Sequence, residues 1–127
     1  MKVIVAENHE EVSRLAADIL EKTVRENPCC TLGLATGSSP VGMYLELARR
    51  CREEGLDFSR VHSVNLDEYV GLAPTHEQSY RYFMNDNLFD HINIPADSSF
   101  LPDGTQTDSA LECARYDRII AEHDGID

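Results

Sequence analysis

Two short polar stretches of the sequence carry residue types that could do chemistry. The first is ATGSSP, residues 35–40, where the hydroxyls of Thr36, Ser38 and Ser39 surround Gly37 just before a helix-like stretch. The N-terminus of a helix binds anions because its N–H groups lack partners and carry a partial positive charge. Glycine lets the backbone approach such a ligand closely. Thr36, Gly37, Ser38 and Ser39 are therefore a candidate phosphate site, and the alternative is a serine-capped helix that binds no ligand.

This first loop differs from the common nucleotide-binding loops. It has neither the GxxxxGK(S/T) spacing of a P-loop nor the GxGxxG spacing of a dinucleotide-binding fold. It also contains no Lys or Arg, so any formal positive charge near a bound phosphate must come from elsewhere.

The second stretch is Asn65-Leu66-Asp67-Glu68, which follows an apolar run. Neighbouring residues on a strand point to opposite faces, so Asp67 and Glu68 should not both face one site. One of them could serve as a general base and the other as a structural acceptor. The alternative is an aspartate that forms a turn beside a solvated glutamate. No further carboxylates stand nearby at ligand spacing, so we expect no metal site.

The elements that must position these stretches follow from the hydrophobic pattern. Short β-branched or apolar runs predict strands at 2–5, 31–34 and 61–66. Helical periodicity predicts helices over 9–27, 40–54 and 80–89, and a last helix that is capped by Thr107 or Asp108. The expected caps are Asn8 and Ser39, with Pro40 in the first turn and Gly55 as a stop. Residues 90–108 are expected to be mostly loop.

The alternation of strands and helices predicts an α/β fold. We expect a three-layer, Rossmann-like parallel sheet with helices on both faces, cut after about three strands, in a single domain over residues 1–127. Ligands of such sheets bind at the carboxyl ends of the strands, where both polar stretches fall. Tyrosines that could line a sugar-sized pocket or fill an aromatic core also follow the second stretch: Tyr69, Tyr80 and Tyr82.

The overall composition excludes several function classes. The net charge is −12, which argues against nucleic acid or an anionic membrane as a partner, because both attract cationic surfaces. No apolar run approaches the roughly 18 residues of a membrane span, so cytoplasm is the expected location. The four cysteines show no CxxC spacing, which again argues against a structural metal.

Three segments, taken in order, carry a resemblance to a known family. LGLATGSSPVGMYLEL, VNLDEYVGL and HEQSYRYFMNDNLFDHINIP together resemble the glucosamine-6-phosphate deaminase family, also called glucosamine-6-phosphate isomerase. The resemblance implies a cofactor-free conversion of glucosamine 6-phosphate into fructose 6-phosphate and ammonia in amino-sugar catabolism. It implies that Asp67 is the base that moves a proton between C2 and C1. The small-molecule sugar phosphate would be held by Thr36, Gly37, Ser38 and Ser39.

The resemblance covers only the N-terminal half of the family's length, and this implies that part of the active site is absent. Two alternatives therefore remain, a non-catalytic sugar-phosphate binding module and a related enzyme such as 6-phosphogluconolactonase. A parallel sheet cut after three strands should also leave an open edge and uncovered apolar surface. We therefore expect an isolated chain of this length to self-associate as a homo-oligomer or to be marginally stable.

Overall fold

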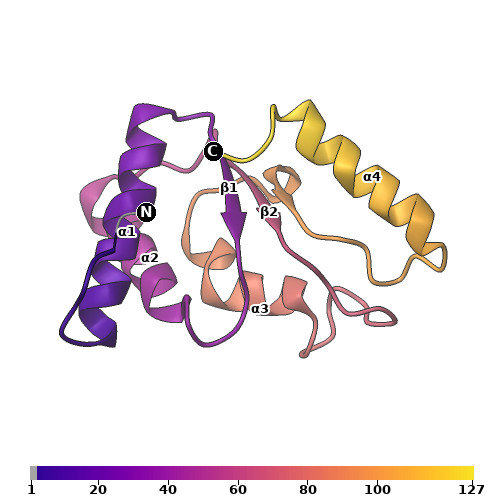
Figure 1. Cartoon of the computed structure of the whole chain (residues 1–127), viewed down its shortest axis with the longest axis horizontal. Helices are drawn as coiled ribbons and strands as arrows, with labels where there is room; N and C mark the ends of the chain where they lie inside the picture. The colour runs from indigo at the N-terminus through magenta and orange to yellow at the C-terminus, as the bar shows by residue number, and fades with distance from the viewer. Residues whose placement is uncertain (1–2) are drawn as a thin grey trace.

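The computed structural model describes residues 3–127, in which three parallel strands form one sheet with the order β1-β2-β3. Four α-helices accompany the sheet (Figure 1). The elements along the chain are α1 (His9–Glu26), β1 (Thr31–Leu34), α2 (Val41–Glu54), β2 (His62–Asn65), α3 (Tyr80–Asn87), the 3-10 turns η1 (Phe89–His91) and η2 (Ala96–Ser98), β3 (Ser99–Phe100) and α4 (Ser109–Glu122). The parallel α/β sheet expected from the sequence is confirmed.

Helices lie on both faces of the sheet because side chains alternate along β1. Leu32 and Leu34 are buried in the core that α1, α2 and α3 share with the sheet. Gly33, between them, points to the opposite face, where a Cβ would lie 3.2 Å from Ile126 Cγ2. On this second side α4 is attached through Tyr116, whose hydroxyl donates to the Asn65 carbonyl at 2.7 Å. Figure 1 shows α4 apart from the α1/α2 pair, with the strands between them.

Most helix boundaries follow local capping chemistry. Asn8 caps α1, and its side-chain oxygen accepts from Glu11 N at 2.9 Å. Gly55 ends α2 in the left-handed region with φ 68°, which glycine adopts without strain. Asp108 caps α4 by accepting from Leu111 N. These three signals were read correctly from the sequence.

The start of α2 differs from the expectation. Pro40, and not Ser39, is the N-cap residue, and α2 begins at Val41. Pro40 offers no side-chain cap, and its carbonyl accepts from Tyr44 N at 3.0 Å as the first bond of the helix. The hydroxyl of Ser39 is therefore placed in the loop, and the residue is exposed. As an N-cap, the Ser39 side chain would have bonded to the helix. Because Pro40 takes that position, the Ser39 side chain stays in the candidate phosphate loop.

The predicted strand at 2–5 is wrong for residues 3–5, which are the part of it that the structure describes. Lys2 lies outside the described residues, and residues 3–5 form no strand. Val3 and Val5 are 71% and 91% exposed. The third strand is instead Ser99–Phe100, inside the stretch expected to be mostly loop, and it pairs with Ser63 and Val64 of β2. A strand needs a neighbouring backbone to bond to, and β-branched composition alone does not supply one.

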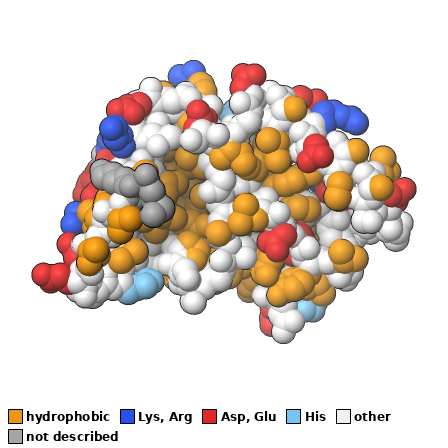
Figure 2. Space-filling model, viewed as in Figure 1, with side chains coloured by type: hydrophobic (Ala, Val, Ile, Leu, Met, Phe, Trp, Pro, Cys, Tyr) orange, Lys and Arg blue, Asp and Glu red, His pale blue; other side chains and the backbone are white. Residues whose placement is uncertain are grey.

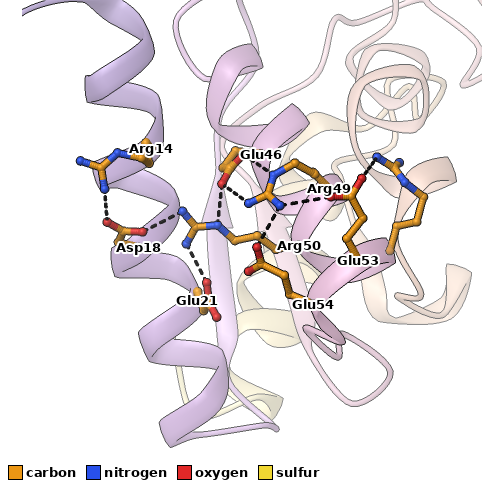
Figure 3. A network of polar contacts seen from close by, with 9 residues as sticks. Arg14, Asp18, Glu21, Glu46, Arg49, Arg50, Glu53 and Glu54 are labelled. Carbon is orange, nitrogen blue, oxygen red and sulfur yellow. Dashed lines mark hydrogen bonds and ion pairs between the residues drawn. The ribbon is translucent and has the colours of Figure 1, made fainter.

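An ion network joins α1 to α2 on the outer side of the molecule (Figure 3). Arg50 of α2 is 6% exposed. Its guanidinium contacts Asp18 at 2.7 Å, Glu21 at 2.6 Å and Glu46 at 2.8 Å. Because each of its planar donor edges meets a carboxylate, the charge of Arg50 is compensated despite its burial. The network fixes α2, and therefore the loop that leads into it.

Apolar side chains are also exposed at the surface. Figure 2 shows hydrophobic side chains gathered on one face, between the α1/α2 pair and α4. Large apolar residues that are more than half exposed include Ile19, Leu45, Leu66, Leu111 and Ile126. In residues 3–127, no helix is both long enough and apolar enough to span a bilayer.

Candidate functional site

The register of β1 and β2 brings the two polar stretches to one edge of the sheet. Leu34 and Asn65, the last residues of these strands, are paired across the parallel ladder. The Asn65 side chain strengthens this junction, because its Nδ2 donates to the Leu34 carbonyl at 3.1 Å. Its Oδ1 is buried without a partner among the described residues. Thr36 lies two residues after Leu34, and Asp67 lies two residues after Asn65. Both loops therefore start from the same pair of residues.

The first loop has the backbone form that an anion site needs. Gly37 has φ +93°, and a Cβ placed there would meet nothing within 4 Å. The glycine is therefore required by its backbone conformation and borders open space. Ser38 and Ser39 are exposed, and Thr36 is half-buried. The loop presents three hydroxyls and the start of α2 to solvent.

The chain just before this loop is held by a buried tyrosine. Tyr44 of α2 is fully buried, and its hydroxyl both donates to the Ala35 carbonyl and accepts from Ala35 N at 3.2 Å. Burial raises the pKa of Tyr44 to about 12, so the hydroxyl keeps its proton at neutral pH. Both polar groups of the Ala35 backbone are thus satisfied by one side chain, and the loop begins from a fixed residue.

The second loop separates two adjacent carboxylates. Asp67 is exposed, whereas Glu68 is half-buried. Glu68 accepts from the backbone N–H groups of Tyr69 at 2.8 Å, Tyr80 at 2.8 Å and Arg81 at 2.9 Å. A carboxylate at the first N–H groups of a helix is favoured by the helix dipole. Glu68 is therefore a structural acceptor at the start of α3, which leaves Asp67 as the carboxylate open to a ligand.

Tyr80, the first residue of α3, lies beside the second loop. Its ring packs against Tyr69 with centroids 4.7 Å apart. The pKa of Tyr80 is raised by the neighbouring Tyr69 hydroxyl, then by partial burial and by the nearby charge of Asp67. Tyr80 therefore belongs to the surroundings of the second loop.

The sequence left two roles open for Tyr80, the lining of a sugar-sized pocket and a place in an aromatic core, and did not distinguish it from Tyr69 and Tyr82. Its signal was weak, because no spacing rule relates it to Asp67 or to Thr36. Only its place directly after Ser79, which caps α3 by accepting from Tyr82 N at 3.0 Å, marks it as a residue at a helix start.

A third loop supports the one that carries Asp67. Gly104 is buried, and its carbonyl accepts from Gly71 N at 2.7 Å. A Cβ on Gly104 would overlap the Tyr69 carbonyl oxygen and would lie 3.1 Å from that of Leu72. The two backbones therefore touch at a point where only glycine fits.

Charged groups near the site are mostly engaged elsewhere. Arg81 donates to Ser99 Oγ at 2.9 Å and to the Ser99 carbonyl at 2.7 Å, and its guanidinium lies 5.8 Å from the Phe89 ring centroid. Within residues 3–127, no group of three or more His, Cys, Asp or Glu side chains is arranged to hold a metal ion. The edge of the sheet thus offers hydroxyls, backbone N–H groups and one accessible carboxylate. Such a set can bind an anion and accept a proton.

Comparisons with known proteins show the family to which the chain belongs. The profile of the family described as Glucosamine-6-phosphate isomerases/6-phosphogluconolactonase matches residues 6–126. The chain is 54% identical, over its whole length, to a glucosamine-6-phosphate deaminase of Clostridium perfringens (strain SM101 / Type A), of which it covers 52%.

Solved structures give the same picture. A monomeric glucosamine-6-phosphate deaminase superposes on the whole chain with a TM-score of 0.97 at 40% identity, and the chain covers 53% of it. A 6-phosphogluconolactonase of Thermotoga maritima superposes on 95% of the chain with a TM-score of 0.73 at 21% identity, which shows the shared fold alone; the chain covers 53% of it. The chain spans about half the length of the relatives it matches. It belongs to the family of glucosamine-6-phosphate isomerases and 6-phosphogluconolactonases.

Proposed function

We propose that this chain supplies the phosphate loop and the proton-transfer base of a glucosamine-6-phosphate deaminase. One observation carries the proposal. The paired ends of β1 and β2 place a glycine- and hydroxyl-rich loop beside an exposed carboxylate, while the neighbouring carboxylate is used to cap a helix. Because the chain spans about half the length of its relatives, the proposal assigns roles only to residues within 1–127.

The proposed reaction turns glucosamine 6-phosphate and water into fructose 6-phosphate and ammonia. In the open-chain sugar, Asp67 takes the proton from C2, the electrons of that C–H bond form a C1=C2 double bond, and the C1 oxygen gains a proton from water. Asp67 then returns its proton to C1, and the lone pair of the amino nitrogen forms a protonated imine at C2. Water adds to this imine, ammonia leaves, and a ketone remains at C2. A carboxylate suits this task because it must reach two adjacent carbons in turn and both take and return one proton.

The proposed role of the loop is to hold the phosphate at the far end of the sugar. Thr36, Ser38 and Ser39 supply hydroxyl donors, and the start of α2 supplies backbone N–H groups. Gly37 keeps this surface open because it carries no side chain. Fixing the remote phosphate orients the reacting carbons relative to Asp67, so that binding energy is used for orientation.

The proposal also includes the cofactor requirement and the setting of the reaction. The proton transfer and imine hydrolysis need no cofactor, since a carboxylate and water supply every step. We place the reaction in amino-sugar catabolism, including that of N-acetylglucosamine, and in the cytoplasm, with a small sugar phosphate as the partner.

Ammonia release from glucosamine 6-phosphate tests the proposal. The assay compares the 127-residue chain with a chimera that joins residues 1–127 to the remaining half of the Clostridium perfringens relative. In the chimera we expect ammonia release that Asp67→Asn lowers by about 10³-fold, within the range of general acid–base contributions. The matched control is Asp117→Asn, an exposed carboxylate of α4, which should keep the full rate.

Three results would contradict the proposal, and each points elsewhere. An Asp67→Asn chimera with the full rate would remove Asp67 as the base. Hydrolysis of 6-phosphogluconolactone without ammonia release would indicate a lactonase. Tight binding of glucosamine 6-phosphate without turnover by the chimera would indicate a binding module.

A further inference from the structure

Tyr44 of α2 contacts the first loop at both of its ends. Its backbone N–H donates to the Pro40 carbonyl at 3.0 Å, where the loop passes into the helix. Its hydroxyl, at the far end of the side chain, donates to the Ala35 carbonyl and accepts from Ala35 N at 3.2 Å, where β1 passes into the loop. Residues 36–39 therefore lie between two points that one residue holds.

The position of Tyr44 is set by packing that does not involve the loop. Its side chain is fully buried in the hydrophobic core. Two residues before it, a Cβ on Gly42 would overlap Ser13 Oγ of α1, so the two helices touch at a point where only glycine fits. Further along α2, Arg50 joins the helix to carboxylates of α1 (Figure 3). The loop therefore takes its position from Tyr44, and Tyr44 takes its own from the core and the helix pair.

The groups that could bind phosphate lie between the two fixed ends or at the helix start. Pro40 gives α2 no side-chain cap, and the first N–H groups of a helix have no acceptor within the helix. Tyr44 N donates the first bond of α2, so these N–H groups belong to residues 41–43. Ser38 and Ser39 are exposed, and Gly37 turns the loop at φ +93°. An anion can therefore meet hydroxyls and N–H groups whose arrangement Tyr44 has already set.

We propose that Tyr44 is a positioning residue that orders the phosphate loop before the ligand arrives, by fixing the loop at Ala35 and at Pro40. The proposal rests on the proposed function, because it names what orders the phosphate site. A loop that is already held in its binding conformation loses less conformational freedom when the ligand binds, and it binds more tightly for that reason. Tyr44 is buried and acts on the phosphate only through the loop.

Removal of the hydroxyl alone separates this role from core packing. Tyr44→Phe keeps the buried ring and the backbone bond to Pro40, and it breaks only the two bonds to Ala35. Ala35 is exposed, so water can bond to its N–H and carbonyl groups in the variant. The fold should therefore persist, and the melting temperature of the variant checks this.

The first test measures hydrogen exchange in the ligand-free 127-residue chain. The Ala35 amide is compared by NMR among the wild type, Tyr44→Phe and Tyr82→Phe, a control whose tyrosine lies in α3 and is 41% exposed. We expect the Ala35 amide to exchange about tenfold faster in Tyr44→Phe, the effect of losing one hydrogen bond, and at the wild-type rate in Tyr82→Phe. An Ala35 amide that exchanges at the same rate in all three chains overturns the proposal.

The second test measures affinity for inorganic phosphate, a probe of the loop without the sugar. The amides of residues 36–39 are followed by NMR in titrations of the wild type, Tyr44→Phe and Val61→Ala. Val61 is fully buried directly before β2, at the end of that strand opposite to Asn65, so its variant weakens the core far from the loop. We expect Tyr44→Phe to weaken phosphate binding by about tenfold. Val61→Ala should keep the wild-type affinity although its melting temperature falls.

The outcomes separate the two proposals. Wild-type phosphate affinity in Tyr44→Phe overturns the role of Tyr44 and leaves the proposed function standing. An equal loss of affinity in Val61→Ala assigns the effect to general stability and also overturns that role. If phosphate shifts no amide of residues 36–39 in the wild type, the phosphate loop of the proposed function is refuted, and the role of Tyr44 falls with it.

Discussion

Replacing Gly104 with alanine tests how the loop that carries Asp67 is held. The added Cβ would overlap the carbonyl oxygen of Tyr69 and would lie 3.2 Å from its carbonyl carbon. Neither atom is the end of a flexible side chain, so the backbones themselves must separate, by about 1 Å to restore ordinary contact. That movement stretches the 2.7 Å bond from Gly71 N to the Gly104 carbonyl beyond hydrogen-bond length.

The cost follows from these two effects. Overpacking of a buried position costs about 1–3 kcal/mol, and the lost hydrogen bond adds about 1 kcal/mol. We therefore expect Gly104→Ala to lower the free energy of unfolding by about 2–4 kcal/mol, measured by urea denaturation. The affinity for glucosamine 6-phosphate should fall in the same variant, because the loop that carries Asp67 is displaced.

The matched control is Gly33→Ala. There the added Cβ meets only the side chain of Ile126, which can move, so the change in stability should stay within about 0.5 kcal/mol. If Gly104→Ala were as mild as Gly33→Ala, the contact between the two loops would not be a constraint. The account of how Asp67 and Tyr69 are held would then be refuted.

Three further predictions concern the support of the site. Arg50→Met should lower the free energy of unfolding by about 1–3 kcal/mol, because it removes the buried cation that joins Asp18 and Glu21 of α1 to Glu46 of α2. The exposed Arg52→Met should change it by less than about 0.5 kcal/mol; equal urea midpoints would contradict this. Hydrogen bonding to Arg49 lowers the pKa of Glu46 from 4.5 to about 2, so the stabilisation it gives is complete above pH 4.5 and is lost as the pH falls towards 2. Urea midpoints measured across that range should fall less steeply in Glu46→Gln, and parallel curves would refute the assignment. Ser79→Ala removes the cap of α3 and should cost about 1–2 kcal/mol, seen as a lower melting temperature; an unchanged value would show that Glu68 alone suffices.

Much of the fold could be predicted because its signals are local. The cap at Asn8, the stop at Gly55 and the periodic apolar residues of the helices depend on residues within a turn or two of each other. The strand Ser99–Phe100 could not be found in this way, because only its pairing with β2 makes it a strand. The converse holds for Val3–Val5, whose β-branched residues have strand propensity but gain no partner.

The two loops of the candidate site could be predicted from the sequence, but the long-range hydrogen bonds between α3 and the second loop could not. Strand order and residue type predicted the loop of Gly37 and one of the two carboxylates Asp67 and Glu68, and the family resemblance singled out Asp67. The different roles of Asp67 and Glu68 could not be predicted, because they depend on α3. The first N–H groups of that helix donate to Glu68, although they lie more than ten residues further along the chain. The single-domain organisation and the expected self-association stay predictions, and sedimentation of the purified chain would measure the latter.

The most direct test of the central claim is a titration of the ¹⁵N-labelled chain with glucosamine 6-phosphate, followed by NMR, with glucosamine as the unphosphorylated control. The account predicts that the backbone amides of residues 36–39 shift with the phosphorylated sugar and not with glucosamine, and that Asp67 and its neighbours shift in the same titration. Shifts confined to other parts of the chain, or equal shifts with glucosamine, would contradict the placement of a sugar phosphate at the carboxyl ends of β1 and β2.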